Sequence, residues 1–197
     1  EQWAKRPADE RFETLEALHR AVHLRDASSR EDEFGLQDLT ARVEDGRFLM
    51  SLRGRDAVAT PWSSRQFLSL IKAPADFLST ISDSVATDAI RDRWERTLIG
   101  IQAGADPITR RALVQTRGGG SPDRIRAFYG SRYARIEDQY VSALLLKGTP
   151  PGFRAPHQYK NGEWGGEVVQ NVGYAGDRDM FVFIIDGGDS VDVGGGD

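Results

Sequence analysis

Apolar residues recur at helical spacing in several parts of the chain. In residues 9–25 they fall on one broad face, which predicts an amphipathic helix capped by Asp9. Thr60 and Pro61 predict the start of a second helix, because proline in the first turn loses no hydrogen bond. Three further helices are expected at residues 74–81, 82–98 and 137–146.

Short apolar or alternating runs predict strands elsewhere. Residues 36–44 and 47–53 flank Asp45-Gly46, a pair that favours the type I′ turn of a hairpin. Residues 27–33 read as a charged loop and 100–107 as a linker. Turns are expected at Asn161-Gly162 and Gly176-Asp177. Further strands are expected at residues 110–116, 123–129, 133–136, 153–159, 166–174 and 180–186.

These elements predict an α+β fold, with N-terminal helices and a hairpin followed by a mostly antiparallel sheet that carries a packed helix. We expect residues 1–35 to form an N-terminal helix and loop, and residues 36–197 to form the α+β domain. The chain begins without Met and stops at a glycine-rich end just after a strand. We therefore expect a domain truncated at its C-terminal end.

Composition excludes several classes of protein. The 197 residues are 39% hydrophobic, which fits a globular chain, and no apolar run is long enough to predict a membrane span. The absence of cysteine excludes disulfides and thiolate metal sites. The N-terminus lacks the apolar segment of a secretory signal, so a cytoplasmic protein is expected.

Charge is distributed unevenly along a chain of net charge −4. Residues 110–135 carry seven arginines against one acid, Asp123, whereas residues 176–197 carry six aspartates against Arg178. Arginine also binds phosphate in bidentate fashion better than lysine does. A genome rich in G and C would explain the general excess of arginine over lysine, but it explains the local cluster less well.

The arginine cluster suggests contact with a polyanion. Strand alternation predicts that Arg124, Arg126 and Phe128 share one face while Ile125 and Tyr129 point the other way. Cations beside aromatic rings suit single-stranded nucleic acid, and a solvated sheet face paired with acids is the alternative. The candidate nucleic-acid-binding residues are Arg110, Arg111, Arg117, Arg124, Arg126, Phe128, Arg132, Tyr133 and Arg135.

No catalytic or metal-binding pattern accompanies this cluster. His19 and His23 have a metal-competent spacing, but no third ligand is near in sequence, and the aspartates of 177–192 lack the pattern of a calcium loop. Asp123 could begin a nuclease pattern, but that pattern requires a lysine two residues after an acid, and none of the four lysines stands there. The chain also lacks the Gly-x-Ser-x-Gly elbow of serine hydrolases. We expect no cofactor and no enzyme activity.

Two stretches resemble a known family. Residues 60–78 resemble its segment of a helix, a small residue, a proline and then Tyr/Phe-Leu. Residues 124–138 resemble its arginine- and tyrosine-containing motif, although Gly130 stands where the family more often has a larger apolar residue. The family is the phage/plasmid-like protein of unknown function, DUF932, and the resemblance covers roughly residues 35–197. It implies a mobile-element protein of a bacterial host with no established reaction.

Two functions remain open. One is a non-enzymatic protein that binds single- or double-stranded nucleic acid, in strand annealing or recombination by fold-level analogy with Rad52-like proteins. The other is a structural or interaction protein that forms a homo-oligomer or binds a host-defence partner. In the second, the arginines would meet the acidic residues 176–197 of a neighbouring subunit.

Overall fold

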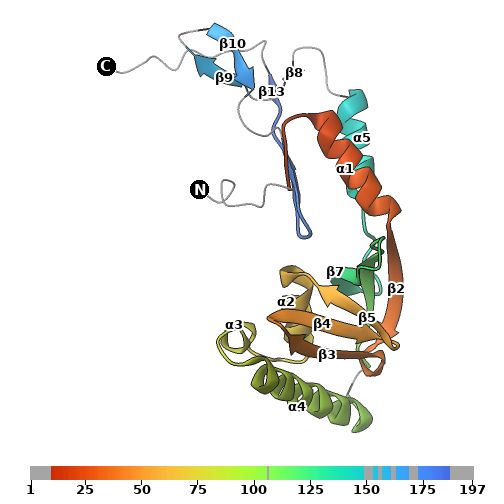
Figure 1. Ribbon diagram of the computed structural model, residues 1–197. Coiled ribbons are helices and arrows are strands. Elements are labelled where there is room, and N and C mark those ends of the chain that lie inside the picture. Colours follow the sequence, from red (N-terminus) through yellow and green to blue (C-terminus); the bar gives the residue numbers. More distant parts are fainter. Residues whose placement is uncertain are drawn as a thin grey trace, which may run out of the picture. The chain divides into compact units, whose positions relative to one another are not determined.

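The computed structural model describes residues 10–105, 107–148 and 173–184, and the backbone of short strands at 153–154, 157–160, 163–168 and 185–186 (Figure 1). The chain forms two compact units. One unit is Ala27–Arg135, and the other combines Glu1–Asp26 with Ile136–Asp197. The boundaries of these units, after Asp26 and after Arg135, differ from the boundary expected at residue 35.

A six-stranded sheet forms the centre of the unit Ala27–Arg135. Every neighbouring pair is antiparallel except β5 and β7, which run parallel; three helices and β6 lie between these two strands along the chain. The α+β fold is therefore as predicted, with a mixed sheet. In spatial order the strands are β2 (Ser29–Gly35), β6 (Thr109–Gln115), β7 (Asp123–Gly130), β5 (Arg55–Ala59), β4 (Arg47–Leu52) and β3 (Leu39–Glu44).

Two tight turns connect β3, β4 and β5. Asp45 and Gly46 have φ of 52° and 68°, as the expected type I′ turn requires. Arg53 and Gly54 repeat this pattern with φ of 50° and 79°. The second turn adds β5, which the sequence pattern did not predict.

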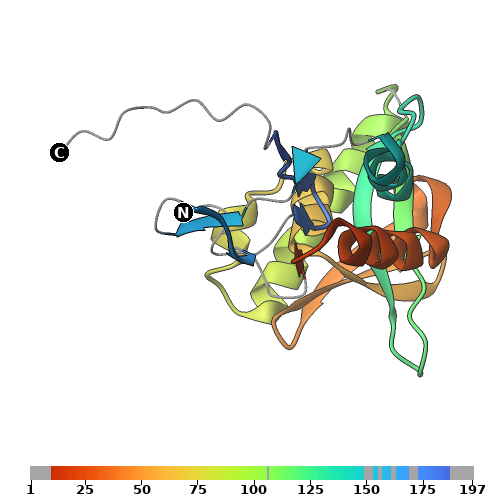
Figure 2. The ribbon, with the colours of Figure 1, turned by 90° about the horizontal axis from the view of Figure 1, so that it is seen from above.

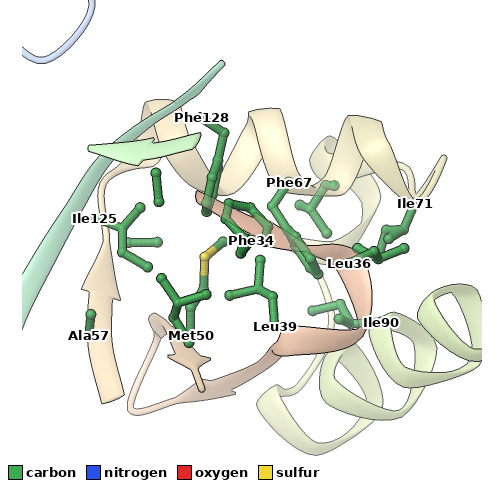
Figure 3. Packing of buried hydrophobic residues seen from close by; sticks show 14 of the residues in the cluster. Phe34, Leu36, Leu39, Met50, Ala57, Phe67, Ile71, Ile90, Ile125 and Phe128 are labelled. Carbon is green, nitrogen blue, oxygen red and sulfur yellow. The ribbon is translucent and has the colours of Figure 1, made fainter. Parts of the chain in front are cut away.

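Helices α2 (Pro61–Leu70), α3 (Ala75–Leu78) and α4 (Asp83–Gln102) follow β5. The side-chain Oγ1 of Thr60 accepts a hydrogen bond from Ser63 N at 3.1 Å, so the predicted cap is confirmed. Phe67 of α2 and Ile90 of α4 lie in one apolar cluster with residues that point from one face of the sheet, such as Met50 and Ile125 (Figure 3). Both helices therefore cover the same face of the sheet.

The second unit pairs two helices beside a small sheet. Strands β1 (Arg11–Phe12), β11 (Gly173–Ala175) and β12 (Met180–Val182) form this sheet, on which α1 (Leu15–Ala27) packs through Leu18 and Val22. Helix α5 (Asp138–Gly148) lies beside α1 (Figures 1 and 2). Strands β9 (His157–Lys160) and β10 (Glu163–Val168) form one further pair, and β8 (Phe153–Arg154) and β13 (Ile185–Asp186) form another.

Polar contacts join α1 to α5. His19 Nδ1 lies 2.8 Å from Ser142 Oγ, and His23 Nδ1 lies 2.7 Å from Gln139 Oε1. The buried Asp26 carboxylate accepts the Gln139 backbone N–H at 3.1 Å, near the start of α5. The two histidines therefore serve helix packing.

Three local predictions fail, at least in part, and one is confirmed. The helix predicted at residues 9–25 begins only at Leu15, because Arg11–Phe12 pair with β11 as strand β1. Residues 27–33, predicted as a loop, contribute to β2, whereas the predicted strand at 133–136 is irregular. At the predicted Gly176-Asp177 turn, Gly176 N donates to Asp179 O at 2.9 Å between the paired strands β11 and β12. The predicted Asn161-Gly162 turn lies outside the described residues.

Candidate nucleic-acid interface

A β-bulge interrupts β7 in the middle of the arginine cluster. Ile125 pairs with Val114 and Ala127 pairs with Leu113, so Arg126 is an extra residue without a partner position on β6. The bulge places Ile125 and Phe128, three residues apart, in the same apolar cluster. The prediction that Arg124, Arg126 and Phe128 share a cationic face is therefore wrong.

The bulge removes two residues from the candidate surface. Phe128 is 4% exposed, and its ring meets Phe34 edge-on at a centroid distance of 5.5 Å. Arg126 is 2% exposed. Neither side chain presents a surface to a ligand, so both predicted contacts are corrected to buried positions.

Strand β2 supplies carboxylates to the arginine-rich strands. Arg111 lies 3.7 Å from Glu31 and 3.6 Å from Glu33, and both acids come from the neighbouring strand. Asp123 pairs in turn with Arg30 at 3.2 Å. Arg111 and Asp123 thus have charged partners on β2, whereas residues 187–197 of the acidic segment lie outside the described residues.

The remaining predicted arginines differ in exposure. Arg110 is partly buried and donates to its neighbour Thr109 O at 2.8 Å. Arg124 and Arg135 are partly buried, and each takes part in an interaction within the protein. Arg117 and Arg132 are exposed. Of the predicted cations, these last two offer the most accessible guanidinium groups.

The exposed Tyr133 ring lies against Tyr129 immediately after β7. Tyr133 N donates to Gly130 O at 2.9 Å, a turn that folds the chain back at the end of the strand. The two ring centroids are 5.5 Å apart and the ring planes are tilted by 57°. Tyr133 is 58% exposed, so much of its ring is open to solvent, directly after the exposed Arg132 in the chain.

Charged groups surround the Tyr129 hydroxyl. Burial raises the pKa of Tyr129 well above the ordinary value, and the Glu31 carboxylate raises that pKa further. Arg135 and Arg111, the latter the cross-strand partner of Tyr129, lower the same pKa. We call Arg111, Tyr129, Arg132, Tyr133 and Arg135 the Tyr133 ledge.

The two stretches that carry the family resemblance bond to each other. Thr60 Oγ1 donates to Arg126 O at 3.1 Å, and Ser63 Oγ donates to Ile125 O at 2.7 Å. Gln66 donates to Phe128 O and accepts from Phe128 N, both at 2.8 Å. The start of α2 therefore holds the β7 backbone that leads to the ledge.

Position 130 does not require glycine for steric reasons. A Cβ added at this position would meet nothing within 4 Å, and β7 continues through it. The departure from the family pattern at this position therefore leaves the strand geometry intact.

The described residues offer no competing catalytic centre that we identify. Ser142 and His19 resemble a nucleophile and base in distance, but Ser142 is fully buried and its hydroxyl lies 2.9 Å from Asp138 O as a donor. The same hydroxyl lies 3.1 Å from Gln139 O, so Ser142 is held within its own helix. No group of acidic or histidine side chains in the described part of the chain is arranged to hold a metal ion.

Comparisons with known proteins leave the family open. No family model matches the chain, and no curated protein or solved structure is significantly similar to it. Within the described residues, no helix has the length and apolar character needed to cross a membrane. The fold and the site together define an α+β protein with an aromatic and cationic ledge.

Proposed function

We propose that this protein binds single-stranded nucleic acid through the Tyr133 ledge. The observation that carries the proposal is the Tyr133 ring, which is 58% exposed and supported by Tyr129 at 5.5 Å. An open aromatic face stacks with any base and contributes about 1–3 kcal/mol per base. Arg132 beside the ring, with Arg111 and Arg135, supplies charge for phosphate.

The proposed role is to hold a strand without cutting it. The ledge combines an exposed ring for stacking with guanidinium groups for phosphate, which are the groups that binding requires. From the resemblance of residues 60–78 and 124–138, we propose that it is a cytoplasmic phage- or plasmid-type protein of a bacterial host. Strand annealing or recombination is the proposed process.

The proposal predicts separate effects for the ring and the cation. Tyr133→Ala should weaken binding to a single-stranded oligonucleotide about tenfold with little change in salt dependence, because it removes stacking alone. Tyr133→Phe should bind nearly as wild type does. Arg132→Ala should reduce the slope of log affinity against log salt by about 0.7, the value for one phosphate contact. Fluorescence anisotropy across a salt series measures both effects.

Arg96→Ala is the matched control for charge. Arg96 is exposed on α4, behind the opposite face of the sheet, and pairs only with Asp92 in the same helix among the ion pairs of the described residues. This substitution changes net charge as Arg132→Ala does but should leave the salt slope as it is. A wild-type chain that does not bind at low salt would overturn the proposed function.

Helix α5 favours self-association as a second candidate function. Its Gln139 and Ser142 side chains face α1, while Tyr140 and Leu144, four residues apart, are 62% and 71% exposed. A helix that buries polar groups and exposes apolar ones is typical of an interaction surface. Light scattering without nucleic acid should then report a dimer or larger species, which Leu144→Lys dissociates. A strict monomer would exclude this candidate.

A further inference from the structure

Arg111 faces two carboxylates that hold it only loosely. Glu33 is its direct cross-strand partner, and Glu31 lies two residues away on the same face of β2. The nitrogen–oxygen distances of 3.6 and 3.7 Å exceed the roughly 2.7–2.9 Å of a charge-assisted hydrogen bond. The side chains of Arg111, Glu31 and Glu33 are 35%, 38% and 58% exposed. Such pairs contribute little to stability and exchange readily.

The same carboxylates border the aromatic part of the ledge. Arg111 pairs across the sheet with Tyr129 on one side and with Glu33 on the other, so the three side chains lie in one row on the face opposite α2 and α4. Glu31 also acts on the Tyr129 hydroxyl. A phosphate that approaches Arg111 therefore meets negative charge beside the cation.

We propose that Glu31 and Glu33 compete with nucleic-acid phosphate for Arg111 and thereby limit the affinity of the ledge. This inference rests on the proposed function. A phosphate must displace both carboxylates, so the electrostatic share of binding falls while stacking on Tyr133 is unaffected. Because phosphate contacts supply most non-specific binding, the competition favours strands whose bases are open to stack.

The double variant Glu31→Gln with Glu33→Gln tests this competition. Glutamine keeps the size of each side chain and removes its charge. At low salt we expect tighter binding to oligothymidylate, by about fivefold for each carboxylate removed, which is the effect of one close charge pair in water. The salt slope should steepen by about 0.7 as Arg111 gains a phosphate contact. Adding Arg111→Ala should cancel both gains.

Asp88→Asn with Asp92→Asn is the matched control. Both aspartates are exposed on α4 and pair within that helix, so this variant changes net charge by the same amount behind the opposite face. If wild type binds but the glutamine variant binds no tighter than the control, the competition is overturned and the proposed function stands. Gains that persist with Arg111→Ala also overturn it. If wild type does not bind at low salt, both proposals fail.

Discussion

Replacing Phe34 with alanine is expected to lower the free energy of unfolding by about 3–5 kcal/mol, the usual cost of removing a buried phenylalanine. Phe34 is 1% exposed and is the only buried residue of β2. Its ring contacts Phe128 of β7 edge-on, so it holds the outer strand to the core (Figure 3). Urea unfolding followed by tryptophan fluorescence measures the loss, since Trp62 and Trp94 lie in the same unit.

Phe77→Ala provides the control for this prediction. Phe77 lies in the same unit but is 57% exposed, so its removal should cost less than about 1 kcal/mol. Phe34→Leu should fall between the two variants because it keeps part of the buried volume. Equal losses for Phe34→Ala and Phe77→Ala would show that β2 does not depend on this side chain.

Local signals in the sequence were sufficient to predict that the helices and one hairpin exist, although α1 begins at Leu15 and not at residue 9. Thr60-Pro61 combines a capping hydroxyl with a residue that suits the first turn, and α2 begins at Pro61. Asp45-Gly46 tolerates positive φ at both positions, and the turn forms there. Each signal works because it acts through neighbouring residues alone.

Strand β2 shows where local signals end. Its sequence carries one arginine, three consecutive acids and one large apolar residue, Phe34, so it reads as a loop. What makes it a strand is pairing with β6, far along the chain, together with the burial of that ring. One apolar residue cannot show the alternating pattern that predicts a strand, and pairing with a distant strand leaves no signal in the local sequence.

The candidate site was predicted in part for a similar reason. Tyr133 between Arg132 and Arg135 was recognisable, because the argument required only residue types. The bulge at Arg126 was not, since one extra residue reverses the alternation for everything after it. Phe128 therefore entered the core, and the carboxylates of Glu31 and Glu33 came beside Arg111 unforeseen.

The bonds from α2 to β7 explain why the strand can continue past its neighbour. Strand β5 ends at Ala59 opposite Ile125, so among the described strands none pairs with the rest of β7 on that side. Gln66 takes the place of a strand there, because its amide donates to Phe128 O and accepts from Phe128 N. One side chain thus satisfies both backbone groups of a residue whose own ring is in the core.

Gln66→Leu is expected to lower the free energy of unfolding by about 2–4 kcal/mol, because two partly buried backbone groups lose their partners. Gln66→Glu should cost nearly as much, since a carboxylate accepts from Phe128 N but repels Phe128 O. Arg65→Ala is the control. The Arg65 side chain, next to Gln66 in the chain, is 68% exposed, so this substitution should lower the free energy of unfolding by less than about 0.5 kcal/mol. Thermal and urea unfolding of the three variants give these values.

The effect of Gln66→Leu should also reach the ledge. Phe128 precedes Tyr129 directly, and Tyr133 depends on the turn at Gly130 that ends the same strand. We therefore expect oligonucleotide binding to weaken in Gln66→Leu even at temperatures where the chain is folded, whereas Arg65→Ala binds as wild type. Full binding in a destabilised but folded Gln66→Leu would show that the ledge is positioned without α2.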